Sequence, residues 1–416
     1  MHKADPVQRY ILNILKITVM KAGEPSDLLD ERRFINIRSQ DDPQGFGVFN
    51  RILHELESQK ILPLTAGFWK KSAYGFEALE KETTECFMDF YRILSCAAAV
   101  TRLFEAQGIP CVVLKGISIA KLYPVPEYRK SSDADILLSR KDDAAAACEL
   151  LEKIGFVRAG EAHSLHHIEF MSPTNVLVEL HTDIAEPFDS ENTNRCLEKL
   201  VSEGCDRRTP FTYAGDETYI FEAPDLGLSI AAHALQHFMR KGMGIKMLLD
   251  WAAFIQYSGL DKTGAQALIK MLNELGIKGF ADAMTRVAIT YLGLDISKAS
   301  LVCDDCNSPL AEWEEAFLAD MFSGGEFGKA SGERMVNLRG TGIGDYIREF
   351  HHQMHLNFPT AGKVFVIWPV LWVVTLVRFL KNNRKLRGTK TGDILKSAGE
   401  RGRIVSGMKL FEKTKG

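Results

Sequence analysis

Residues 111–138, CVVLKGISIAKLYPVPEYRKSSDADILL, decide the fold predicted for this chain. A first apolar run ends at Lys115-Gly116, and a second apolar run follows Asp133 and Asp135. If this second run is a strand, its side chains alternate between two faces, so both aspartates point the same way. Two carboxylates on one face repel each other, and a divalent cation such as Mg²⁺ would neutralise them. The stretch therefore predicts two strands with a metal site at the start of the second.

The turn after the first strand predicts a phosphate site. Gly116 would let the backbone turn tightly into a helix at 117–122. The N–H groups at such a helix start, next to Lys115, favour a bound phosphate, and Ser118 belongs to the same segment. Arg129 is a further candidate, either for phosphate or for an ion pair that holds the loop before the first aspartate.

Two more strands are expected at 166–171 and 176–181, because a Ser-Pro-Thr-Asn turn signal separates these two runs. Alternation along the second of them places Glu179 and His181 on one face. If this strand neighbours the strand at 133–138, Glu179 and His181 would project beside the aspartate pair.

These segments together resemble the catalytic core of the polymerase-β-like nucleotidyltransferase superfamily, and in particular a bacterial family described only as uncharacterised nucleotidyltransferases. The likeness rests on Leu-Lys-Gly at 114–116, Arg129, the D-x-D at 133–135 and Glu-Leu-His at 179–181. It covers residues 110–185. The resemblance implies transfer of a nucleoside monophosphate from an NTP to an acceptor hydroxyl or phosphate.

The same resemblance assigns the site residues. It implies that one or two Mg²⁺ ions are held by catalytic carboxylates, that the NTP is bound by basic and small residues of the turn, and that two histidines wall the site. The carboxylates are Asp133, Asp135 and Glu179, the nucleotide-binding residues are Lys115, Gly116, Ser118 and Arg129, and the histidines are His181 and His237.

Composition limits the partners and the compartment. The chain has 416 residues and a formal net charge of −3, so it offers no bulk attraction for long DNA or RNA. Its eight cysteines are scattered, which favours a reducing cytoplasm over a disulfide framework. The N-terminal sequence MHKADPVQRY is too polar for a signal peptide. The expected partners are an NTP and an acceptor whose identity the sequence does not give.

The expected fold class is α+β, with a small mixed-sheet nucleotidyltransferase core between helical regions. We expect an N-terminal helical region at 1–109, the α/β core at 110–224, a helical domain at 225–322, and a linker, apolar helix and basic tail at 323–416. Apolar residues at helical spacing predict helices over 44–58, 78–107, 141–154, 245–257, 262–275, 278–293 and 309–322, and a further short strand is expected at 217–223.

The apolar segment at 364–377 precedes a run of basic residues that continues to 387. It is too short to span a bilayer, for which about 20 apolar residues are needed. Two interpretations remain open. The segment is either a buried helix or a helix in a membrane interface, with Trp368 and Trp372 at headgroup level and the basic run on anionic lipid. The second interpretation would make the protein, which is expected in the cytoplasm, membrane-associated. The family resemblance implies an association with polysaccharide biosynthesis, which would suit such a location.

Two other functions stay open. A glycosyltransferase would use the D-x-D motif for a nucleotide-sugar–metal complex, but it needs a larger sheet before the motif, where residues 1–109 predict helices. A catalytically inactive nucleotide-binding or scaffold protein would keep the fold without turnover. Ile117 stands where the superfamily usually has Gly or Ser, which is the departure that favours this second alternative.

Overall fold

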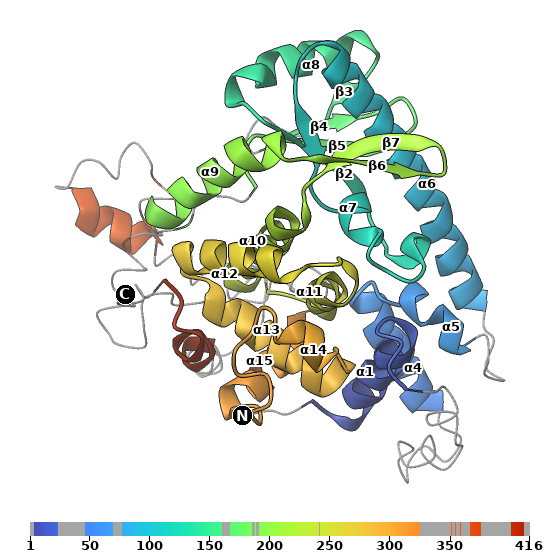
Figure 1. The fold of residues 1–416 in the computed structure, drawn as a ribbon, viewed down its shortest axis with the longest axis vertical. Helices are drawn as coiled ribbons and strands as arrows, with labels where there is room; N and C mark the ends of the chain where they lie inside the picture. The colour runs from blue at the N-terminus through green and yellow to red at the C-terminus, as the bar shows by residue number, and fades with distance from the viewer. Residues whose placement is uncertain are drawn as a thin grey trace.

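The computed structural model describes residues 4–23, 46–69, 77–159, 167–184, 188, 191–240, 242–324, 351, 354, 358, 367–375 and 401–411. A small mixed sheet and the helices beside it form one half of the molecule, and a layer of helices forms the other half (Figure 1). The α+β fold class is confirmed. The carboxylate-bearing strands lie at the boundary between the two halves.

The sheet has five strands in the spatial order β1-β2-β5-β4-β3. The strands are β1 (Cys111–Val113), β2 (Asp133–Leu138), β3 (Val157–Arg158), β4 (His167–Met171) and β5 (Leu177–His181). The pair β2 and β5 is parallel, and the other pairs are antiparallel. The predicted adjacency of the strand at 133–138 and the strand carrying Glu179 is therefore confirmed. The four predicted strands of the core, β1, β2, β4 and β5, are confirmed to within one residue at their ends.

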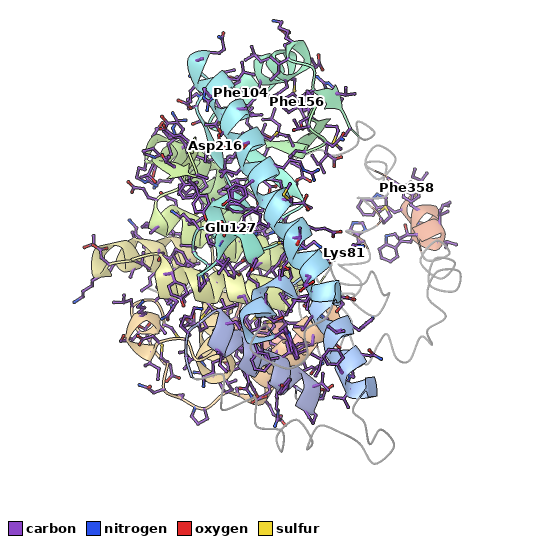
Figure 2. All side chains as sticks on the ribbon, turned by 90° about the vertical axis from the view of Figure 1, so that its right-hand side faces the viewer. Lys81, Phe104, Glu127, Phe156, Asp216 and Phe358 are labelled. Carbon is purple, nitrogen blue, oxygen red and sulfur yellow. The ribbon has the colours of Figure 1, made fainter. Side chains whose placement is uncertain are left out.

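One face of the sheet is covered by α6 (Glu77–Ala106) and by α8 (Ala144–Lys153), which follows the short turn η3 (Lys141–Asp143). Figure 2 shows α6 running along the molecule from the region of Lys81 to Phe104. Its 30 residues span about 45 Å at 1.5 Å per residue. The apolar positions of α6 pack with those of the sheet into one hydrophobic cluster.

Successive side chains along a strand point alternately toward α6 and α8 and toward the helical layer. In β2, Ala134, Ile136 and Leu138 join the cluster under α6, whereas Leu137 joins the cluster of the helical layer. Asp133 and Asp135 share the face of Leu137, because successive side chains point to opposite faces. The aspartates therefore face the helical layer, which supplies the remaining walls of the site.

The helical layer is formed mainly by the long helices that follow residue 222. Four of them had predicted ranges, 245–257, 262–275, 278–293 and 309–322, and these agree with the observed bounds to within three residues, since each has an apolar stripe at helical spacing. The helices are α10 (Ala223–Arg240), α11 (Ile245–Tyr257), α12 (Lys262–Glu274), α13 (Lys278–Leu292), α14 (Ile296–Ala299) and α15 (Glu312–Gly324).

The N-terminal helices join this layer. Asp5 caps the first of them in a capping box with Gln8, and Pro6 occupies its first turn as the sequence predicts. Apolar residues of these helices share one buried cluster with the helices after residue 222. The elements are α1 (Pro6–Thr18), α4 (Phe46–Ser58), η1 (Pro63–Thr65) and α5 (Ala66–Trp69). Ahead of the sheet, residues 4–23, 46–69 and 77–106 therefore hold helices and no strand, unlike the large sheet that a glycosyltransferase would need.

Several elements were not predicted from the sequence, among them the helices α9 (Glu191–Asp206) and α14 and the strands β3 and β6 (Thr209–Tyr213). The strand expected at 217–223 corresponds to β7 (Asp216–Ile220), which pairs with β6 in a hairpin. The α9 sequence holds three Glu and two Asn among 16 residues, and its narrow apolar stripe of Leu197, Leu200 and Val201 gives a weak signal.

The segment 401–411 forms a helix that packs against α13, and this contact depends on a missing side chain. A Cβ at Gly279 would lie 2.1 Å from the carbonyl oxygen of Met408, which is backbone and has little room to move. Arg401, at the start of this helix, is buried, and its guanidinium lies 4.9 Å from the centre of the Phe238 ring. The 401–411 helix is therefore part of the core of the helical layer.

We expect Gly279→Ala to destabilise the protein by about 1–3 kcal/mol, because the added methyl group overpacks the contact with the 401–411 helix. Thermal unfolding measures the loss, and hydrogen exchange of 401–411 should rise selectively. Gly67→Ala is the matched control, since a Cβ there meets nothing within 4 Å. Equal melting temperatures for both variants would contradict this account of the contact.

The apolar segment at 364–377 is described only over 367–375, where it is helical with Val370 and Val373 about 60% exposed and Leu371 buried. Its basic continuation to 387 lies outside the described residues. Within the described part of the chain, no helix combines the length and apolar character needed to cross a bilayer.

Candidate active site

The parallel pairing of β2 and β5 builds the candidate site. The register sets Asp135 opposite Glu179, and Leu137 opposite His181. Because the partners in a parallel pair carry their side chains on the same face, the second aspartate, the glutamate and the histidine converge. Oxygen and nitrogen atoms of Asp135, Glu179 and His181 all lie within 4.8 Å of one another. Of the three carboxylates predicted to converge, Asp135 and Glu179 belong to this group, whereas Asp133 does not.

Asp135 lies at the centre of the cluster. Its side chain is 3% exposed, and its Oδ1 lies 2.8 Å from the Nζ of Lys115 and 2.9 Å from the Nε2 of His181. The same His181 nitrogen lies 3.2 Å from the Oε2 of Glu179, whose side chain is 18% exposed. Lys115 is thus a partly buried member of the cluster, with its side chain 22% exposed.

The charges in this cluster shift one another's pKa values. Although burial opposes it, Lys115 and His181 hold the pKa of Asp135 below its usual value. A hydrogen bond from His181 lowers the pKa of Glu179. Burial would lower the pKa of His181, but its bonds to Asp135 and Glu179 raise it. The cluster therefore keeps Asp135 and Glu179 ionised at neutral pH.

Asp133 behaves in the opposite way. Burial, followed by repulsion from Asp135 and Glu179, raises the pKa of Asp133 from 3.8 to about 6, despite the nearby ammonium groups of Lys115 and Lys246. The nearby cations thus do not offset the effect of burial and of the other two carboxylates on Asp133. An added divalent cation would favour the ionised form of Asp133, and two carboxylates with a third nearby form an oxygen-rich donor set that suits Mg²⁺. The residues present therefore fit such an ion.

We expect Asp133→Asn to stabilise the metal-free protein at pH 7.5. Because the folded state resists ionisation of this group, the cost is absent below about pH 4 and complete above pH 6. At about 1.4 kcal/mol per pKa unit, the rise in the pKa from 3.8 to about 6 corresponds to a gain of roughly 3 kcal/mol at pH 7.5, which falls below about 1 kcal/mol at pH 4. Thermal unfolding in a chelator at both pH values measures it, with Asp304→Asn as an exposed control. A gain of the same size at both pH values would contradict the charge explanation.

The chain between the strands forms what we call the Gly116 corner, residues 114–118. Gly116 has a φ of +56°, a conformation that favours glycine, and a Cβ there would lie 3.3 Å from the Oγ of Ser131. The helix that follows, α7 (Ile117–Ala120), is shorter than predicted. The hydroxyl of Ser118 donates to the carbonyl of Leu114 at 2.7 Å, so this side chain closes the corner itself.

Arg129 makes an ion pair, the second of its two predicted roles. Its Nε and Nη2 lie 2.7 Å from the two carboxylate oxygens of Asp250, and both side chains are 7% exposed. It follows the short turn η2 (Pro126–Tyr128). No local pattern indicates Asp250 as the partner, because 121 residues separate Arg129 from Asp250.

Of the two histidines on α10, His233 is the one beside the site. It lines a small cavity of about 10 Å³ together with Lys115 and Asp250. Burial, and then Lys115 and His237, lower the pKa of His233 well below its usual value. The ring of His237, the predicted wall residue, contacts His233 with ring centres 4.5 Å apart. Helical spacing predicts that these two residues share a face, but it does not tell which of them meets the strands.

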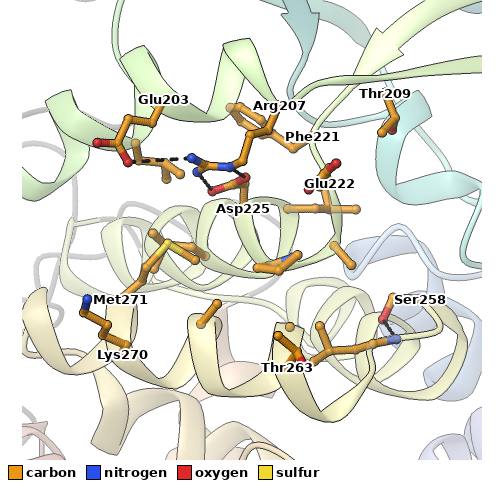
Figure 3. A pocket seen from close by; sticks show the side chains of 18 of the residues that line it. Glu203, Arg207, Thr209, Phe221, Glu222, Asp225, Ser258, Thr263, Lys270 and Met271 are labelled. Carbon is orange, nitrogen blue, oxygen red and sulfur yellow. Dashed lines mark hydrogen bonds and ion pairs between the residues drawn. The ribbon is translucent and has the colours of Figure 1, made fainter.

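A cleft of about 790 Å³ lies between α9, the start of α10 and α12. None of the residues of the acidic cluster lines it. Figure 3 shows Arg207 bridging Asp225 and Glu203 in its wall. Several charged residues of this cleft pair with each other, among them Arg207 with Asp225 and Lys270 with Glu274. The cleft and the acidic cluster are therefore separate features of the fold.

Comparison with known proteins gives one strong match. A family model described as "Uncharacterised nucleotidyltransferase" matches residues 50–293, which is more than half of the chain and includes every residue of the candidate site. No curated protein is significantly similar to the chain. Among solved structures, it is similar to an antigenic nucleotidyltransferase-like protein from Paracoccidioides brasiliensis at 16% identity and a TM-score of 0.31, over 49% of this chain and 93% of that one.

Proposed function

The chain belongs to the uncharacterised nucleotidyltransferase family, and from this premise we propose that it transfers a nucleoside monophosphate from an NTP to an acceptor hydroxyl or phosphate. One observation carries the proposal. Asp135 and Glu179 meet in register on neighbouring parallel strands, directly beside Lys115 and the Gly116 corner. Carboxylates for a cation and a cationic corner for phosphates are the two features that this transfer requires.

The roles of the residues follow from their exposure and charge. Asp135 and Glu179, with Asp133 beside them, would hold a divalent cation, which when bound supplies electrostatic stabilisation to the phosphate oxygens. Lys115, 22% exposed, would hold the triphosphate by charge. Glu179 is more exposed than Asp135, so it is the carboxylate placed to accept the proton of an acceptor hydroxyl. Attack of the acceptor oxygen on the α-phosphorus then releases pyrophosphate.

Incubation with each of the four NTPs, Mg²⁺ or Mn²⁺, and pooled acceptors tests the proposal through pyrophosphate release. We expect release with at least one NTP, and at least a hundredfold loss in Glu179→Gln. Glu149→Gln is a control, since Glu149 lies on α8 away from the cluster and its side chain is 70% exposed. Binding of no NTP by the wild-type protein would overturn the proposal.

A catalytically inactive nucleotide-binding protein is the second candidate function. The observation in its favour is that Lys115 and His181 both bond to the same Oδ1 of Asp135, so the protein's own cations already compensate this carboxylate. This alternative predicts NTP binding of equal affinity with and without a divalent cation, and no pyrophosphate release. A nucleotide titration in chelator against one in Mg²⁺ separates the two candidates.

A further inference from the structure

We propose that Asp250, on α11, is a positioning residue of the candidate active site that acts through Arg129 on the Gly116 corner. The inference rests on the proposed function, because it gives Asp250 a part in holding the nucleotide phosphates. Asp250 belongs to the helical layer, outside the sheet that carries the carboxylates. The proposal therefore makes the helical layer a working part of the site.

The first step is the fixed geometry of the pair. Arg129 and Asp250 are joined by two parallel bonds of 2.7 Å, and the hydroxyl of Tyr123 donates to the same Asp250 Oδ1 at 2.7 Å. All three residues are buried. A two-bond contact between a planar guanidinium and a carboxylate fixes orientation as well as distance. Arg129 is thus held in one position by a residue that does not itself reach the strands.

The second step is what the held guanidinium contacts. The remaining nitrogen of Arg129, Nη1, donates to the Oγ of Ser131 at 3.0 Å and to the carbonyl oxygen of Gly116 at 3.4 Å. The first bond fixes the loop two residues before Asp133. The second fixes the turn whose positive φ at Gly116 is needed to place Lys115 beside the carboxylates.

The third step is that the two segments also touch each other. A Cβ on Gly116 would meet both the Oγ of Ser131 and, at 3.5 Å, the carbonyl oxygen of Asp133. The Gly116 corner and the start of β2 are therefore packed together, with Arg129 bonded to both. Asp250 also lines the small cavity that Lys115 and His233 line. Loss of the Asp250 carboxylate would release the guanidinium, and with it the relative position of the corner and the aspartates.

The test replaces the buried charges without leaving one of them alone. The triple variant Arg129→Met, Asp250→Leu and Tyr123→Phe removes both charges and the hydroxyl that would lose its acceptor. Such apolar replacements of a buried ion pair commonly leave stability unchanged or improved. The matched control is Arg286→Met with Glu314→Leu, a buried pair at 2.8 Å between α13 and α15 that does not contact the site.

Two readouts are compared among the wild-type protein, the triple variant and the control pair, provided that their melting temperatures are equal. Amide exchange over 113–133 should accelerate at least tenfold in the triple variant, and the Kd for the Mg²⁺ complexes of the α,β-methylene analogues of the four NTPs should rise at least tenfold. The control pair should change neither. Wild-type exchange and Kd in a stably folded triple variant would overturn the inference, since a purely structural pair predicts that outcome.

The two proposals can fail separately. If the wild-type protein binds none of the four analogues, the proposed function and the nucleotide role of Asp250 both fail. If the wild-type protein binds an analogue and the triple variant binds it equally well, only the positioning role of Asp250 fails. Faster exchange at the corner together with weaker nucleotide binding supports the inference.

Discussion

Asp135→Asn should lower pyrophosphate release by about 10³-fold or more, the largest functional effect that we expect from one substitution in this chain. Asp135 is the most buried of the three carboxylates and the one that both Lys115 and His181 contact. Removing its charge takes away the group around which the other two carboxylates and the cations are arranged. Initial rates at saturating NTP measure the effect.

The same substitution should also change the binding of a divalent cation. Mn²⁺ titration followed by electron paramagnetic resonance is expected to show a site in the wild-type protein that Asp135→Asn loses. Asp206→Asn is the control, because Asp206 is an exposed aspartate at the end of α9. Full pyrophosphate release by Asp135→Asn would remove the metal-dependent transfer mechanism from consideration.

Gln59→Leu should produce the largest loss of stability, about 3 kcal/mol or more. Gln59 is 0% exposed and makes three hydrogen bonds to backbone groups of distant elements. Its Nε2 donates to the carbonyls of Met321 and Phe322 at 3.2 and 3.1 Å, and its Oε1 accepts the N–H of Ile245 at 2.8 Å. Leucine fills most of the space but leaves buried backbone groups without partners, and each such group costs about 1–3 kcal/mol.

Chemical denaturation of the Gln59→Leu variant gives the change in the free energy of unfolding. Gln107→Leu, at the exposed end of α6, is the control and should change stability by less than about 0.5 kcal/mol. A loss confined to 1 kcal/mol in Gln59→Leu would show that the three backbone groups find other partners.

The sequence predicted those features that depend on local period and on one resemblance. The helix at 245–257 was predicted to the residue because Gly244 and Ser258 flank a dense apolar pattern. The strands carrying Asp133, Asp135 and Glu179 were predicted from alternation, which is a pattern within a few residues. Their adjacency was implied by the resemblance, through the D-x-D pattern and the later Glu.

The parts that could not be predicted are contacts between distant segments. Nothing in the sequence around Arg129 indicates that its partner is Asp250, which lies 121 residues further along the chain. The choice between the His233 and His237 rings likewise depends on how α10 is rotated against β2. Such pairings are set by packing over the whole chain, for which a local pattern carries no signal.

The parallel pairing of β2 and β5 has a consequence for the order in which the protein assembles. Parallel neighbours cannot be joined by a tight hairpin, so the chain must first complete a long crossover that includes α8 and β4. Asp135 and Glu179 are therefore brought together late, when the strand that carries the glutamate docks beside β2. The repulsion between the two carboxylates is deferred to this final docking, and an incompletely folded chain carries the residues of the site without its charge cluster.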